Sequence, residues 1–173
     1  MKNLHSARTP GGQKFVWGPL ALAFFFAALH AGMAFADVAD DVSRVFELSE
    51  KLRPGMTIQA INELLGPPEE EYRLQGKAAG TVRYQWVHGI MGVAIYEVEG
   101  SAYRVDITLP CGNASETTKA MGAMERMGNR KYGTSAPSLD RLNGHYYWVR
   151  DGIRFAYSKY NSTTVQSSFT LAH

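Results

Sequence analysis

Apolar and polar residues alternate along residues 102–109. Tyr103, Val105, Ile107 and Leu109 fall on one side of an extended chain, and Arg104, Asp106 and Thr108 fall on the other. A period of two predicts a strand with one buried side. Segments rich in β-branched and aromatic residues predict five further strands, at 82–88, 91–98, 146–150, 154–159 and 164–171.

Apolar residues at helical spacing predict three helices, over 37–51, 58–65 and 116–127. Thr57 and Ser115 are expected to cap the second and third helices, and Gly66 and Gly128 to end them. The polar segments 69–80 and 129–144 are expected to be loops. An order of helices and three-stranded meanders predicts an α+β fold with antiparallel strands.

The chain repeats itself at an offset of 62 residues. Tyr84-Gln85-Trp86-Val87 returns as Tyr146-Tyr147-Trp148-Val149, and Leu65-Gly66 returns as Met127-Gly128. Such self-similarity predicts one supersecondary unit used twice. We therefore expect two tandem repeats, 37–110 and 111–173, each a helix with a three-stranded antiparallel meander, which together form one domain. The two tryptophans are expected to be packing residues.

The repeat also predicts the two sides of the strands. Positions that are apolar in both halves are expected to pack against the helices: Tyr84/Tyr146, Trp86/Trp148, Val93/Phe155, Ile95/Tyr157, Ile107/Phe169 and Leu109/Leu171. The opposite side carries Arg83, Gln85, Tyr96, Arg104, Asp106 and Thr108 in the first half and His145, Tyr147, Gln166, Ser168 and Thr170 in the second.

Residues 1–36 have the pattern of a secretory signal peptide. Three basic residues and no acid precede the apolar stretch 15–36, which ends in Ala34-Phe35-Ala36. Cleavage is expected between Ala36 and Asp37, with export to the periplasm or the medium; an uncleaved membrane anchor is the alternative. Without these three of its 18 basic residues, the chain carries 15 against 16 acidic residues, so its net charge of +2 becomes −1. Nothing in this balance favours nucleic-acid binding.

Cys111 is the single cysteine of the chain. An internal disulfide is therefore excluded, and we expect a small buried residue at a turn. No cysteine stands at the predicted cleavage site to carry a lipid.

A further pattern lies in the first half of the chain. Arg53-Pro54-Gly55-Met56-Thr57, a short helix, Leu64-Leu65-Gly66-Pro67-Pro68 and a downstream Tyr-x-Trp strand resemble the SmpA/OmlA (BamE) family of small outer-membrane lipoproteins. Two such units in tandem resemble the β-lactamase inhibitor protein, whose two helix–sheet repeats form a concave sheet that grips a partner. The resemblance implies a binding scaffold. The second half lacks the Gly-Met-Thr start, and the lipid-bearing cysteine and the inhibitor's disulfides are missing.

No motif in the chain indicates a catalytic site. His88, His145 and His173 do not stand at metal-ligand spacing, Ser115, Ser167 and Ser168 lack a nucleophile-elbow context, and the acidic run 69–71 is typical of a solvated loop. We expect no enzyme activity, metal or cofactor. One alternative is a small hydrolase, in which the fold would join His88 or His145 to an acid and a nucleophile.

The main functional hypothesis is an exported, inhibitor-like module that binds an envelope or secreted protein. Tyrosines among short polar residues suit a protein-binding surface, because they offer large area at low entropic cost. The candidate partner-binding residues are Tyr96, Arg104, Tyr147 and His145. An ordinary solvated sheet face is the competing interpretation. An accessory of outer-membrane assembly or envelope integrity is the other functional alternative.

Overall fold

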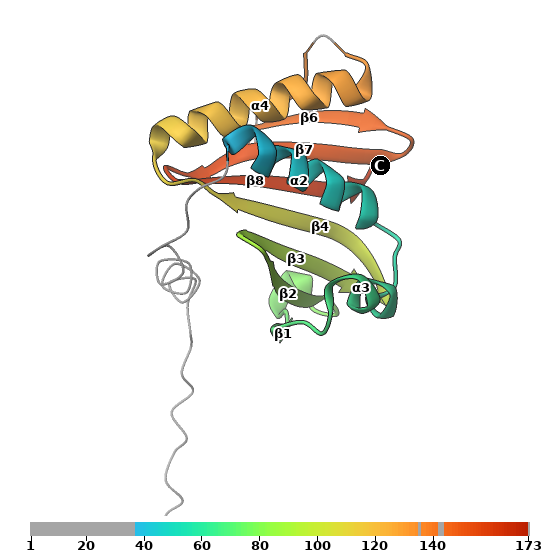
Figure 1. Ribbon diagram of the computed structural model, residues 1–173. Coiled ribbons are helices and arrows are strands. Elements are labelled where there is room, and N and C mark those ends of the chain that lie inside the picture. Colours follow the sequence, from blue (N-terminus) through green and yellow to red (C-terminus); the bar gives the residue numbers. More distant parts are fainter. Residues whose placement is uncertain (1–36, 135, 142–143, 173) are drawn as a thin grey trace, which may run out of the picture. The chain divides into compact units, whose positions relative to one another are not determined.

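A single antiparallel sheet of eight strands, in the order β1-β2-β3-β4-β8-β7-β6-β5, organises the described part of the chain (Figure 1). The computed structural model describes residues 37–172 except 135, 142 and 143, and the predicted signal peptide lies outside them. The strands are β1 Glu70–Arg73, β2 Val82–His88, β3 Met91–Val98, β4 Ser101–Pro110, β5 Ser138–Asp140, β6 His145–Arg150, β7 Ile153–Asn161 and β8 Thr164–Leu171. The predicted bounds of β2, β3 and β8 are confirmed.

Three α-helices lie on one side of this sheet (Figure 1). They are α2 Val38–Lys51, α3 Ile58–Leu65 and α4 Ala114–Tyr132, and a 3-10 turn, η1, covers Gly76–Ala78. The side chains of Asp37, Thr57 and Asn113 accept hydrogen bonds from backbone N–H groups in the first turns of these helices. None of the helices in the described residues is long and apolar enough to cross a membrane.

The core fills the space between the helices and the sheet. Val42, Val45 and Phe46 of α2 and Met124 of α4 are buried together with Trp86, Val93, Ile95, Ile107, Trp148, Phe155 and Phe169 of the strands. The predicted helix-facing set is therefore largely confirmed. Tyr146 and Leu171 differ, with exposures of 39% and 46%. Cys111 is a buried free cysteine, as expected.

Two segments predicted as loops contain edge strands. β1 pairs with β2 through Glu70↔Gln85 to Arg73↔Val82, and β5 pairs with β6 through Ser138↔Tyr147 to Asp140↔His145. Both strands are mostly exposed and lack apolar alternation. Their pairing is decided by the adjacent strand, so the periodicity of their own sequence could not predict it.

The predicted bounds of α4 are also wrong. Asn113, not Ser115, is the N-cap, and its Oδ1 accepts from the Glu116 N–H at 3.0 Å. Gly128 lies inside the helix, which continues to a left-handed Gly133 at its C-terminus. Gly128 has no side chain because the Trp148 ring packs against its Cα: a Cβ there would lie 2.2 Å from the ring.

A β-bulge reverses the orientation of Tyr103. Tyr96 pairs with Arg104, but Glu97 pairs with Ala102, so Tyr103 is an extra residue on β4. Ala102 is buried beneath the helices, whereas Tyr103 is exposed and its ring lies 6.3 Å from that of Tyr96. The prediction that Tyr103 shares a side with Val105 is therefore wrong.

The predicted pair of units with one helix and three strands each, as in the β-lactamase inhibitor protein, is wrong: each half of the described chain contributes four strands to a single sheet. The first half has two helices and the second has one, and β4 pairs with β8 through seven register positions, so all eight strands belong to one sheet. The two tryptophans nevertheless have similar local contacts. Both are buried; the Trp86 Nε1 donates to the Gly66 carbonyl at 2.9 Å and the Trp148 Nε1 to Asn129 Oδ1 at 3.0 Å. Both act as packing residues, as predicted.

The substitution Gly128→Ala tests the packing of α4 on β6. We expect it to destabilise the protein by about 2 kcal/mol or more, because the Trp148 ring or the helix must shift. Gly122→Ala is the matched control, because the nearest atom to its new Cβ is the flexible Arg126 Nη1 at 3.4 Å. That variant should gain about 0.5–1 kcal/mol from helix propensity. Urea unfolding measures both; equal effects of the two substitutions would contradict this packing.

Candidate functional site

The side of the sheet opposite the α-helices carries the predicted binding residues. We call it the polar face and define it by Tyr72, Arg83, Gln85, Tyr96, Tyr103, Arg104, Asp106, Thr108, His145, Tyr147, Arg154, Gln166, Ser168 and Thr170. Strand register orders these residues in rows across the sheet. One row runs Tyr72, Arg83, Tyr96, Arg104, Thr170, Arg154, and the next runs Gln85, Ala94, Asp106, Ser168, Ala156, Tyr147.

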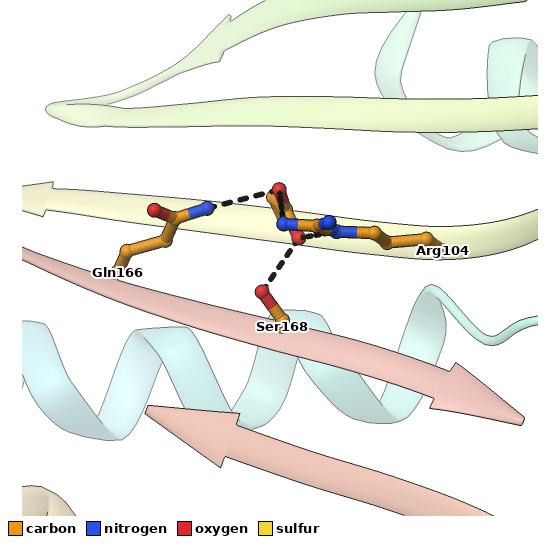
Figure 2. Close-up of polar contacts among 4 residues, drawn as sticks. Arg104, Gln166 and Ser168 are labelled. Carbon is orange, nitrogen blue, oxygen red and sulfur yellow. Dashed lines mark hydrogen bonds and ion pairs between the residues drawn. The ribbon is translucent and has the colours of Figure 1, made fainter. Parts of the chain in front are cut away.

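Asp106 occupies the centre of the polar face, on β4. Its carboxylate accepts from Arg104 Nε and Nη2, both at 2.7 Å, from Gln166 Nε2 at 2.9 Å and from Ser168 Oγ at 2.7 Å. Figure 2 shows Arg104, Gln166 and Ser168 converging on this point from β4 and β8. Asp106 is only 3% exposed, so these bonds hold a buried charge and join the two central strands.

Tyr96 lies between two guanidinium groups. The Cζ atoms of Arg104 and Arg83 are 5.0 Å and 5.7 Å from its ring centroid, within cation–π range. Burial raises the pKa of the Tyr96 hydroxyl, and the charge of Asp106 adds to this effect. Burial opposes the charge of Arg104, but the hydrogen bonds and charge of Asp106 outweigh it and raise the pKa of Arg104. Both side chains therefore keep fixed protonation states at neutral pH.

A second cluster lies across β5, β6 and β7. The Arg154 guanidinium stacks over the Tyr147 ring, with Cζ 4.3 Å from the centroid, and its Nη2 donates to Asp140 Oδ2 at 2.9 Å. His145 is half-buried and pairs in register with Asp140. Four strand spacings separate β3 from β6, which places Tyr147 about 19 Å from Tyr96 across the sheet.

The structure thus brings Tyr96 and Arg104 into contact and places Tyr147 and His145 on the same face, beyond β8 and β7. Sequence reasoning missed Arg154 and Tyr103 as members of this face. The alternation of the two faces along β7 predicts that Arg154 lies on the polar face, because it is two positions before Ala156. No sequence signal marks the bulge that turns Tyr103 outward.

The hydrolase alternative required His88 or His145 to meet an acid and a nucleophile. His88 lines a pocket of about 270 Å³ between α2 and the β2–β3 turn, with Asp41, Arg44, Glu47, Leu48, Lys51, Gly89, Ile90 and Met91. This lining contains acids but no serine, threonine or cysteine. In the part of the chain that the structure describes, no three histidine, cysteine, aspartate or glutamate side chains form a group able to hold a metal.

Asp41 is the buried acid of this pocket. Its side chain is 5% exposed, and Arg44 Nη1 lies 3.5 Å from its Oδ1. Burial raises the pKa of the Asp41 carboxyl, because removing it from water disfavours the ionised form; Arg44 offsets this in part.

Neither a family model nor a curated protein matches the chain significantly. A solved structure that is distantly similar is a cysteine-rich secretory protein of Staphylococcus aureus subsp. aureus Mu50, with 13% identity and a TM-score of 0.38 over 68% of this chain and 42% of that one. The chain therefore spans less than half of that protein's length. At this TM-score the similarity carries no argument about function.

The resemblance to the SmpA/OmlA (BamE) family, in tandem as in the β-lactamase inhibitor protein, is therefore wrong. No family model matches, and the described residues share one eight-stranded sheet. Local requirements explain the motif that suggested it. Gly55 has a φ of 93° and Thr57 caps α3, while Gly66 ends α3 with a φ of 83°. These residue types are common wherever a short helix starts and stops.

Asp106→Ala tests the central network. We expect a loss of about 2–4 kcal/mol in the free energy of unfolding, because four donors lose their acceptor and Arg104 keeps a half-buried charge. Glu50→Ala breaks an exposed ion pair with Lys131, of 2.9 Å, and should cost less than about 1 kcal/mol. Urea unfolding compares the two; similar losses would show that Asp106 is not held as described.

Asp41→Asn tests the buried acid through pH. A raised folded-state pKa means that Asp41 contributes stability below its unfolded pKa of about 3.8, and that this contribution is lost as pH rises through the folded value. The variant should therefore match the wild type near pH 3 and become the more stable of the two towards pH 7. Asp40→Asn, an exposed neighbour in the same helical turn, controls for the helix dipole. Parallel pH profiles of the two variants would contradict the burial argument.

Proposed function

We propose that the protein is a non-enzymatic binding module that recognises another protein through the polar face. The observation that carries this is the combination of exposed and half-buried tyrosines with half-buried arginines on the side of the sheet that the three α-helices leave uncovered. Tyrosine and arginine are, with tryptophan, the residue types that are enriched among the residues carrying most of the binding energy in protein interfaces. Ordinary solvated faces are rich in lysine and glutamate, and no lysine or glutamate belongs to the central rows between Arg83 and Arg154.

The dimensions of the face fit a protein partner. Eight strands span seven inter-strand spacings, or about 34 Å. With three side-chain rows along the strands, the area approaches the roughly 800 Å² that each partner contributes to a standard interface.

The side chains of the polar face are already ordered. Arg104 is held by Asp106, Tyr96 by two guanidinium groups, and Tyr147 by Arg154. Fixing these long side chains before contact lowers the entropic cost of association. The signal-like residues 1–36 support export, so the partner we propose is an envelope or secreted protein.

The double variant Tyr96→Ala/Tyr147→Ala tests the proposal. We expect it to reduce capture of the partner at least about tenfold, because each tyrosine offers a large pre-ordered contact. The full-length chain, with a C-terminal tag, would be expressed in its source organism and used to isolate partners from an envelope extract, with quantitative mass spectrometry as the readout.

Tyr146→Ala is the matched control. Tyr146 is 39% exposed and pairs in register with the buried Tyr157, on the helix side of the sheet, so its loss should leave capture unchanged. Circular dichroism confirms that each variant is folded. Unchanged capture by the folded double variant would remove the polar face as the binding surface.

A further inference from the structure

On the polar face, each of three carboxylates accepts hydrogen bonds from within the protein, but one arginine has no acidic partner. Asp106 accepts four hydrogen bonds, two of them from Arg104, and Asp140 accepts one from Arg154. At the margin, Glu70 accepts from the Tyr72 hydroxyl at 2.6 Å and from Gln85 Nε2 at 3.2 Å. Each of these carboxylates is therefore engaged within the protein. Of the arginines on the polar face, Arg83 is the one that has no ion pair within the described residues.

The contacts of Arg83 fix the position of its guanidinium group but leave most of its N–H groups without a hydrogen-bond acceptor. Its Nη2 reaches Gln85 Oε1 at a long 3.4 Å, and its Nε is buried without a hydrogen-bond partner. No hydrogen bond is formed by its Nη1 in the described part of the chain. Packing beside Tyr96 and register pairing with Tyr72 and Tyr96 fix the group in place. An oriented cation with unused donors is suited to accept an anion from outside.

We propose that the partner of the polar face presents an acidic segment, and that Arg83 binds one of its aspartate or glutamate carboxylates. This inference rests on the proposed function and specifies the chemistry of its partner. Because Nε is covered, the carboxylate approaches the two terminal Nη atoms, a geometry in which a planar carboxylate can accept two parallel hydrogen bonds. Tyr96, whose ring centroid lies 5.7 Å from the Arg83 Cζ, and Tyr72 are its register neighbours on the two adjacent strands.

The surroundings favour a carboxylate over a phosphate. Phosphate carries up to two negative charges, and sites that select it usually combine several free cations or backbone N–H groups. Here Arg104 and Arg154 are already neutralised, and Glu70 and Asp106 lie in the row beside Arg83. A single negative charge is balanced by one free guanidinium, whereas a second would be repelled by these acids.

The test uses the full-length chain labelled with ¹⁵N for NMR. Hexaglutamate, hexaglutamine and inorganic phosphate are titrated separately while the Nε–H resonance of Arg83 is followed. We expect hexaglutamate to shift this resonance in a saturable manner, with hexaglutamine and phosphate at least about tenfold weaker. A shift with phosphate of equal affinity, or none with hexaglutamate, would overturn the proposal.

The variant Arg83→Gln, with Arg126→Gln on α4 as control, links this chemistry to partner capture. Arg83→Gln should lower capture about tenfold or more and weaken its dependence on salt, while Arg126→Gln should leave capture unchanged. If capture depends on Tyr96 and Tyr147 but not on Arg83, the acidic partner is wrong and the binding function stands. If capture does not depend on the tyrosines, the binding function itself fails.

Discussion

The pairing of β4 with β8 is the constraint on which the rest of the structure depends. These strands come from distant parts of the chain and form the centre of the sheet. Without them the described residues would form two four-stranded sheets, each with an unpaired inner edge. Asp106 reinforces this join, since its partners Gln166 and Ser168 lie 60 and 62 residues away. The continuity of the polar face, and of the core beneath the helices, follows from this one pairing.

Much of the local structure could be predicted from periodicity. β2, β3 and β8 have strong alternation or dense β-forming residues, and their predicted bounds agree with the structure. Thr57 and Gly66 set the ends of α3 through backbone requirements that any fold must meet. The buried and uncovered sides of the central strands were predicted for the same reason, since a regular strand leaves no freedom about where each side chain points.

The remaining features depend on contacts between distant segments. The bulge at Tyr103 moves this aromatic side chain to the opposite face of the sheet, and the residues around it contain no pattern that predicts the bulge. Gly128 looks like a helix end but serves the close approach of Trp148, 20 residues later. The repeat at an offset of 62 residues correctly predicted the packing of both tryptophans, but it did not predict the architecture. The candidate site was found only in part, because the partners of Asp106 and Arg154 become visible only once the register is known.

The short edge strands also limit the ways in which this protein can associate with other proteins. β1 is only four residues long and three of them are charged; β5 is three residues long and ends in the charged Asp140. Strands this short and polar offer a poor template for the main chain of another molecule, which limits fibril-like stacking and strand exchange. An encounter that succeeds must therefore be made through side chains standing above the sheet. Selectivity for a partner then depends on the shape and charge of these side chains. They can be substituted without breaking the backbone hydrogen bonds that hold the sheet together.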